Sequence, residues 1–202
     1  MVKAGSGFYT PSMIVEGVVT SVDSAGQLNV APMGPIVHGN FDSLTLRPFQ
    51  TSTTFQNLQQ TRCGVFHVVD DVTLLAQAAI GQLTEVPPTR PANTITGRIL
   101  VDCCRWFEFR VTDFDVGDQR TVLQTGIVAT GEVRPFFGFN RARHAVLEAA
   151  ILATRVHLLD EQMIMDQFEV LKSAVDKTGE VAESEAFAML QNYVAAAFEP
   201  TQ

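Results

Sequence analysis

The stretch Leu44–Gln60, LTLRPFQTSTTFQNLQQ, decides how the rest of the chain is interpreted. It begins with a strand pattern that delivers Arg47, and four consecutive hydroxyl residues, Thr51 to Thr54, then lead into a short helical pattern. Thr53 and Gln56 match the S/T-x-x-E/Q capping box, so we expect the helix to start at Thr53.

This junction of strand and helix has the chemistry of an anion site. The first turn of a helix has backbone N–H groups without intrahelical partners, and the helix dipole there favours negative charge. Arg47 would add a charge-assisted, bidentate contact to a phosphate. The alternative is an ordinary capped helix with a solvated Arg47, since helix caps are far commoner than phosphate sites. The local residues alone do not decide between the two.

Composition limits the partners. The chain has 202 residues, of which 46% are hydrophobic and 18% charged, as in ordinary globular proteins. Its formal net charge of −8 disfavours nucleic acid and anionic membrane surfaces, which select clustered Lys and Arg. No apolar run is long enough to span a membrane, and the first residues lack the apolar core of a signal peptide. We therefore expect a cytoplasmic protein.

The cysteines and histidines do not indicate a metal site. Cys103 and Cys104 are adjacent, and neighbouring side chains on a strand point to opposite faces, so we expect these two and Cys63 to be buried free thiols. His67 lies in an apolar strand pattern, where a hydrogen-bonded core histidine is commoner than a ligand.

Strand patterns dominate the first 135 residues. A hairpin is expected from 13–21 and 28–32, and a helix over 72–80 would be capped by Asp70-Asp71. The proline-rich segment Glu85–Asn93 is expected to be a loop. Six or seven strands with short connections favour a small barrel over a doubly wound sheet. The other expected strands are 41–46, 63–69, 97–114 and 119–133.

Helical patterns follow. Asn140 and Asp160 are expected to cap two amphipathic helices, the second ending at Gly179, and a third helix is expected from about Ser184 to Ala197. The chain is thus interpreted as a mainly β domain, residues 1–135, and a C-terminal helical appendage, residues 136–202. We expect the appendage to pack on the barrel or on a second subunit.

Three motifs carry a resemblance to a known family. APMG (31–34), LRPFQTSTTFQNL (46–58) and RPFFGFNRARHAVLEAAILATR (134–155) resemble an uncharacterised family of FMN-binding split-barrel proteins, distantly similar to flavin reductases. The resemblance implies a split β-barrel followed by helices, and a homodimer with FMN near the subunit interface.

The same resemblance implies which residues form the site. Met33 and Gly34 would lie beside the flavin ring, and the third motif would supply possible substrate or ligand contacts at Asn140, Arg141 and His144. The phosphate and ribityl chain would be held by Arg47, Pro48, Thr51, Ser52, Thr53, Thr54 and Asn57.

Two functions are compatible with these residues. The first is an FMN-dependent oxidoreductase of unknown substrate, in which FMN performs the electron transfer and the protein needs no catalytic constellation of its own. The second is a non-catalytic module that holds FMN or another phosphorylated ligand and uses its helices as an interaction surface. A protein with the fold but no ligand is a third possibility. The sequence contains no P-loop, G-x-G-x-x-G, G-x-S-x-G or H-E-x-x-H motif.

Overall fold

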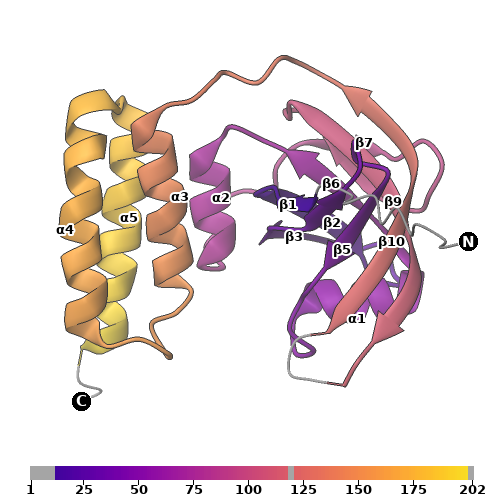
Figure 1. Cartoon of the computed structure of the whole chain (residues 1–202), viewed down its shortest axis with the longest axis horizontal. Helices are drawn as coiled ribbons and strands as arrows, with labels where there is room; N and C mark the ends of the chain where they lie inside the picture. Colours follow the sequence, from indigo (N-terminus) through magenta and orange to yellow (C-terminus); the bar gives the residue numbers. More distant parts are fainter. Residues whose placement is uncertain (1–11, 118–120, 200–202) are drawn as a thin grey trace, which may run out of the picture.

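A curled β-sheet lies beside a layer of helices in the computed structural model, which describes residues 12–117 and 121–199 (Figure 1). Within these residues the main sheet has eight strands in the order β1-β4-β5-β10-β9-β6-β2-β3, each antiparallel to its neighbours. The sheet curls into a half-barrel, so the expected mainly β barrel is confirmed. The strands are β1 (Ser12–Ile14), β2 (Gly17–Val22), β3 (Leu28–Met33), β4 (Ile36–His38), β5 (Ser43–Leu46), β6 (Cys63–Val68), β9 (Arg105–Asp115) and β10 (Val122–Glu132).

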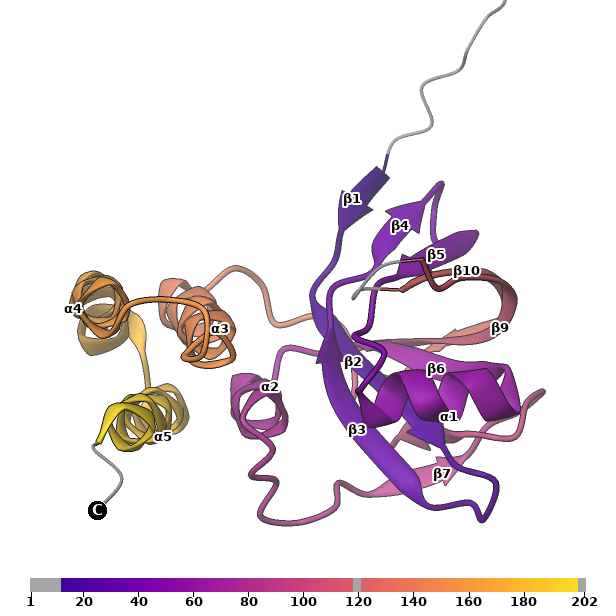
Figure 2. The ribbon, with the colours of Figure 1, turned by 90° about the horizontal axis from the view of Figure 1, so that it is seen from below.

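The helices that follow β6 in the chain lie on one side of the sheet, as Figure 2 shows from below. The side chains of Asp71, Asn140 and Asp160 accept hydrogen bonds from first-turn N–H groups, so these three expected caps are confirmed. Gly179 ends the second of the C-terminal helices, as expected. The helices are α1 (Thr53–Thr61), α2 (Val72–Ala79), α3 (Arg141–Ala153), α4 (Glu161–Thr178) and α5 (Val181–Phe198).

Several expected elements have different bounds, and the expected loop Glu85–Asn93 contains a short strand. The strand expected over 13–21 is interrupted at Val15-Glu16, which separates β1 from β2. The strand expected over 97–114 is divided into β8 (Arg98–Leu100) and β9, because β8 pairs with β7 (Thr89–Pro91) in a separate two-stranded sheet. The short strand β4 was not expected. Residues 118–120 lie outside the described ranges, and they include the end of the connection expected over 115–118 and the start of the strand expected over 119–133.

The helix α1 starts at Thr53, as expected, but two details of the expected caps are wrong. Ser52, not Thr53, caps α1: its Oγ accepts a hydrogen bond from the Phe55 N–H at 3.2 Å. A serine one residue earlier competes for the same role, and its extended backbone favours it. Asp70 does not cap α2, because its carboxylate is paired with Arg134 at 2.6 Å.

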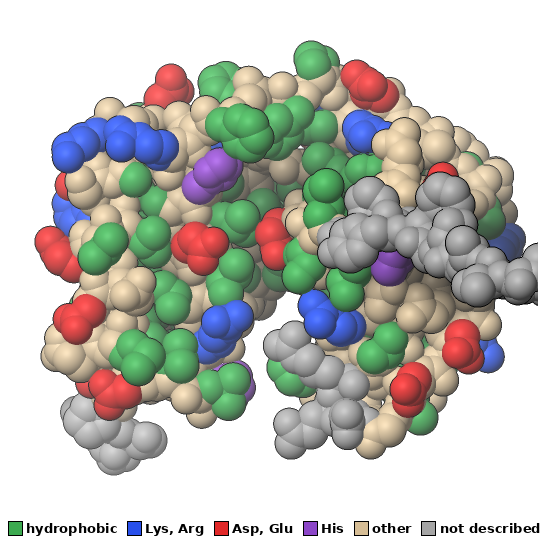
Figure 3. Space-filling view, viewed as in Figure 1, with side chains coloured by type: hydrophobic (Ala, Val, Ile, Leu, Met, Phe, Trp, Pro, Cys, Tyr) green, Lys and Arg blue, Asp and Glu red, His purple; other side chains and the backbone are tan. Residues whose placement is uncertain are grey.

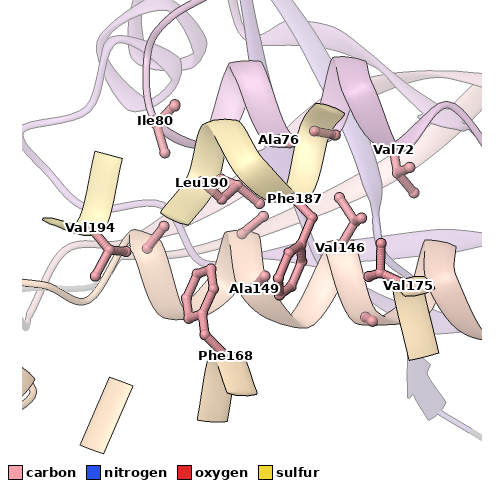
Figure 4. Close-up of a cluster of buried hydrophobic side chains, with 14 of the residues drawn as sticks. Val72, Ala76, Ile80, Val146, Ala149, Phe168, Val175, Phe187, Leu190 and Val194 are labelled. Atoms are coloured by element: carbon pink, nitrogen blue, oxygen red, sulfur yellow. The ribbon is translucent and has the colours of Figure 1, made fainter. Parts of the chain in front are cut away.

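The helix α2 belongs to two cores. Its Leu75 packs on the convex side of the sheet with residues such as Val65 and Ile99. Figure 4 shows Val72, Ala76 and Ile80 from the opposite face of α2 packed among side chains of α3, α4 and α5. A third cluster, with Phe66, Phe107 and Phe109, fills the barrel under α1.

The buried histidine and cysteines are as expected. His67 is fully buried, accepts a hydrogen bond from the Leu100 N–H through Nε2 at 3.1 Å, and contacts the Val18 carbonyl through Nδ1 at 3.2 Å. Burial lowers the pKa of His67 to about 4, so the ring is a neutral core group. Cys63, Cys103 and Cys104 are buried free thiols, and burial raises the pKa of Cys103 to about 11.

Candidate functional site

A cavity of about 300 Å³ lies where the barrel meets the helices. In Figure 3 the surface is hollowed between these two parts of the molecule. The lining comes from β3, from the segment between β5 and α1, and from the inner faces of α2 and α3. It consists of Glu16, Ala31, Pro32, Met33, Gly34, Arg47, Pro48, Phe49, Ser52, Thr54, Leu75, Ala79, Leu147, Ala150, Ile151 and Thr154.

One end of the cavity is formed by the junction of β5 and α1. The exposed Arg47 follows β5 directly and lines the cavity, and its guanidinium has no ion pair within 12–117 and 121–199. Ser52 uses the Phe55 N–H for its cap, and the Gln56 N–H donates to the Ser52 carbonyl. The N–H groups of Thr53 and Thr54 make no hydrogen bond to the described residues and remain able to bind an anion.

Two hydroxyls complete this end. The buried Thr54 accepts a hydrogen bond from Asn29 Nδ2 at 3.0 Å, which leaves its own hydrogen free to donate. Ser52 Oγ donates to the Phe49 carbonyl at 2.8 Å, so its hydrogen is already engaged. Thr54 is therefore the better hydroxyl donor for a ligand.

The other polar group is a carboxyl near Met33 and Gly34. Met33 ends β3, Gly34 follows it, and both line the cavity. Glu16, from the break between β1 and β2, lies against Gly34. Burial, followed by the nearby Glu148, raises the pKa of Glu16.

The helical part supplies the apolar wall. Leu147 and Ile151 are four residues apart on α3 and share one face, Ala150 lies beside them, and Thr154, the C-cap of α3, follows. Across the cavity from the barrel residues, this wall offers a surface suited to an aromatic or otherwise apolar ligand group.

Six of the nine residues expected to hold the cofactor line the cavity, and three do not. Thr51 and Thr53 are exposed outside the lining, although the Thr53 backbone lies in the first turn. Asn57 is buried and donates to Ser21 Oγ at 3.1 Å, which ties α1 to β2. The lining residues are Met33, Gly34, Arg47, Pro48, Ser52 and Thr54.

The three residues of the third motif that were expected to contact a substrate or ligand, Asn140, Arg141 and His144, lie outside the lining. Asn140 caps α3 and donates to the Thr178 carbonyl at 3.0 Å, so both ends of its amide serve the structure. Arg141 and His144 are exposed at the start of α3, and the His144 ring is 5.7 Å from that of Phe139. The cavity is lined by the later turns of the same helix.

Neither Glu16 nor the side of α3 that lines the cavity was predicted from the sequence to belong to the site. A sequence pattern indicated each. Glu16 is the one charged residue in the strand pattern MIVEGVVTS, and Leu147, Ile151 and Thr154 form a stripe beside the core positions of α3.

A cluster of charges holds α3 in place beside the barrel. Asp70, at the end of β6, accepts hydrogen bonds from Arg134 Nη1 and Nη2 and from the Phe137 N–H. Arg143 on α3 lies 3.8 Å from the same carboxylate and bonds Glu183 of α5 at 3.0 Å. These contacts fix the helix that forms the cavity wall.

The described residues contain no group of three or more His, Cys, Asp or Glu side chains arranged to hold a metal ion. None of the described helices is long and apolar enough to cross a membrane.

The fold defines the class of protein. A structure of an FMN-bound protein from Methanosarcina mazei, of the family DUF447, matches with a TM-score of 0.79 and 24% identity, covering 93% of this chain and 98% of that one. A 2-nitrobenzoate 2-nitroreductase from Pseudomonas fluorescens matches at 0.50 and 20%, covering 62% and 67%. A flavoredoxin from Methanosarcina acetivorans matches at 0.51 and 11%, covering 67% and 81%. The chain therefore has the split-barrel fold seen in these proteins.

The family follows from the sequence models. Residues 15–133 match the model described as "Protein of unknown function (DUF447) N-terminal domain", and residues 140–192 match that described as "Protein of unknown function (DUF447)". The chain belongs to the DUF447 family, which confirms the expected resemblance. No curated protein matches the chain significantly.

Proposed function

We propose that this protein binds FMN in the cavity between barrel and helices and is a flavin-dependent oxidoreductase. The observation that carries the proposal is the gathering of Arg47, two unbonded first-turn N–H groups and the Thr54 hydroxyl at one end of a cavity whose other walls are largely apolar. The FMN-bound family member from M. mazei supports FMN as the anion that binds at this end of the cavity.

The residues fit the parts of FMN. Arg47, Thr54 and the first turn of α1 would hold the phosphate, with Pro48 and Ser52 beside it. Met33 and Gly34 would lie near the ring, and the α3 wall would cover apolar ring surface. A volume of about 300 Å³ is at the low end of ligand sites, so part of the cofactor would extend beyond the cavity.

We further propose that the protein is a homodimer with FMN near the subunit interface. A partner would cover the part of the cofactor that one chain leaves open. Large exposed apolar side chains in the β10–α3 connection, Phe136, Phe137 and Phe139, are available for such a contact. Size-exclusion chromatography with light scattering would test the dimer, and a monomeric holoprotein would contradict it.

Bound FMN would supply the electron transfer, so the protein's part is to bind, orient and exclude water. The visible spectrum of the purified protein tests the cofactor. Anaerobic addition of NADH or NADPH tests turnover, because reduction bleaches the flavin bands. Retention of the bands with both donors and with candidate substrates would favour a binding module instead.

Arg47→Ala is expected to weaken FMN binding while the fold survives. Losing a hydrogen bond to a charged group costs about 1.5–3 kcal/mol, or roughly a 10- to 150-fold rise in Kd. Fluorescence titration of the apoprotein would measure it. Arg98→Ala, exposed and outside the lining, is the matched control. Riboflavin, which lacks the phosphate, should bind both variants alike, and an unchanged FMN Kd in Arg47→Ala would contradict the phosphate assignment.

A further inference from the structure

The Glu16 carboxyl is the polar group of the cavity to which the proposed FMN site gives no role. Glu16 and Arg47 are the two charged side chains of the lining. Glu16 makes no hydrogen bond or ion pair with any other residue of the described ranges. Glu16 lines the cavity but is exposed by its accessible surface, so without a partner its carboxyl does not stabilise the fold.

The position of this carboxyl is defined by Gly34. Oε1 and Oε2 of Glu16 lie 2.6 and 2.8 Å from the point that a β-carbon at residue 34 would occupy. The carboxyl therefore lies directly on the Met33-Gly34 stretch, which is the part of the cavity proposed for the flavin ring. A ligand group beside this stretch would lie within reach of Glu16.

The charges around Glu16 favour its neutral form. Desolvation, and after it the negative charge of Glu148 on α3, raise the pKa of Glu16. Arg47, the positive group of the lining, belongs to the phosphate end. The Glu16 carboxyl can thus hold a proton nearer to neutral pH than a glutamate without these two influences can.

We propose that Glu16 is the acid–base group of this cavity, which takes up a proton when an anionic flavin binds and donates it to a ligand or substrate atom beside Met33-Gly34. In the donation, the O–H bond of Glu16 breaks and the proton bonds to a lone pair on a nitrogen or oxygen of the acceptor. The carboxylate then regains a proton from solvent hydronium, which leaves water, and no electrons move to or from Glu16. Glu148 is a positioning residue that acts through its charge. The inference rests on the proposed function.

Proton uptake and FMN affinity test this role without turnover. FMN would be titrated into apoprotein at several pH values, and fluorescence quenching would give its affinity. A second titration, in weakly buffered solution with a pH indicator, would measure proton uptake. Wild type would be compared with Glu16→Gln, Glu148→Gln and Glu132→Gln, the last being an exposed glutamate outside the lining. The FMN phosphate titrates near pH 6 in every variant, so differences between variants isolate Glu16.

Wild type should bind FMN more tightly below the pKa of Glu16 and take up a fraction of a proton on binding. If FMN raises that pKa by one unit, affinity changes about tenfold across the titration. Glu16→Gln should lose both effects, Glu148→Gln should move them to lower pH, and Glu132→Gln should match wild type. FMN binding with the same pH profile and proton uptake in wild type and Glu16→Gln would overturn this inference alone. Failure of every variant to bind FMN would overturn the proposed function and the inference together.

Discussion

Phe168→Ala should be the most destabilising of the substitutions considered, by about 3–5 kcal/mol, because it leaves a cavity in the helical core. Phe168 is 1% exposed, and its ring centroid lies 5.3 Å from that of Phe187. Figure 4 shows it entering the cluster from α4. Chemical denaturation followed by circular dichroism would measure the loss.

Met163→Ala is the control for Phe168, since Met163 is on the same helix but 54% exposed. Its effect should be within about 0.5 kcal/mol of wild type. Equal effects of the two substitutions would contradict the packing of α4 against α5.

Asp70→Ala should cost about 2–4 kcal/mol and should also weaken FMN binding. Removing the carboxylate takes away the acceptor of Arg134 Nη1 and Nη2 and of the Phe137 N–H, which lie 2.6–3.0 Å from it. The Asp70 side chain is 5% exposed but that of Arg134 is 36% exposed, so the cost falls below that of a fully buried pair. FMN affinity should fall because α3, the cavity wall, loses its tie to β6.

Asp102→Ala provides the matched control for Asp70. Asp102 bonds the same arginine at 2.7 Å, yet its side chain is 73% exposed, so its removal should cost no more than about 1 kcal/mol. A larger loss from Asp102→Ala than from Asp70→Ala would show that the buried contact is not the important one.

The Asp70 contacts also predict acid sensitivity. Hydrogen bonds from Arg134, and then from the Phe137 N–H, lower the pKa of Asp70 from 3.8 to about 2. A carboxyl with a lowered native pKa stabilises the fold above its unfolded pKa, and this contribution is lost as pH falls through the native value. The stability difference between wild type and Asp70→Ala should therefore be full above about pH 5 and shrink between pH 4 and 2. A difference that stays constant over this interval would contradict the assigned pairing.

Local chemistry accounts for what the sequence could predict. The caps at Asp71, Asn140 and Asp160 depend on a side chain and the three residues after it, and they were predicted correctly. The strand-to-helix junction at Arg47 was also predicted, because it too depends on residues that are close together in the sequence. Where two hydroxyls compete, as at Ser52 and Thr53, the local pattern does not choose between them.

The remaining features depend on residues distant in sequence. Glu16 comes to the site only because the chain breaks between β1 and β2 and returns beside Gly34. Asp70 is removed from its expected cap by Arg134, which is 64 residues away. The α3 wall could be seen as an apolar stripe, but its partner surface on the barrel could not. The division at residues 135 and 136 stays a prediction.

The helix α2 packs in both the sheet core and the helical core, and this limits how the chain can evolve or be engineered. Because Leu75 serves one core and Val72, Ala76 and Ile80 serve another, the helical segment and the barrel should melt in one cooperative transition. A barrel cut after residue 135 would expose an apolar helix face to water and tend to aggregate. Recombination that exchanges the C-terminal helices between relatives would have to carry a matching outer face of α2 with them.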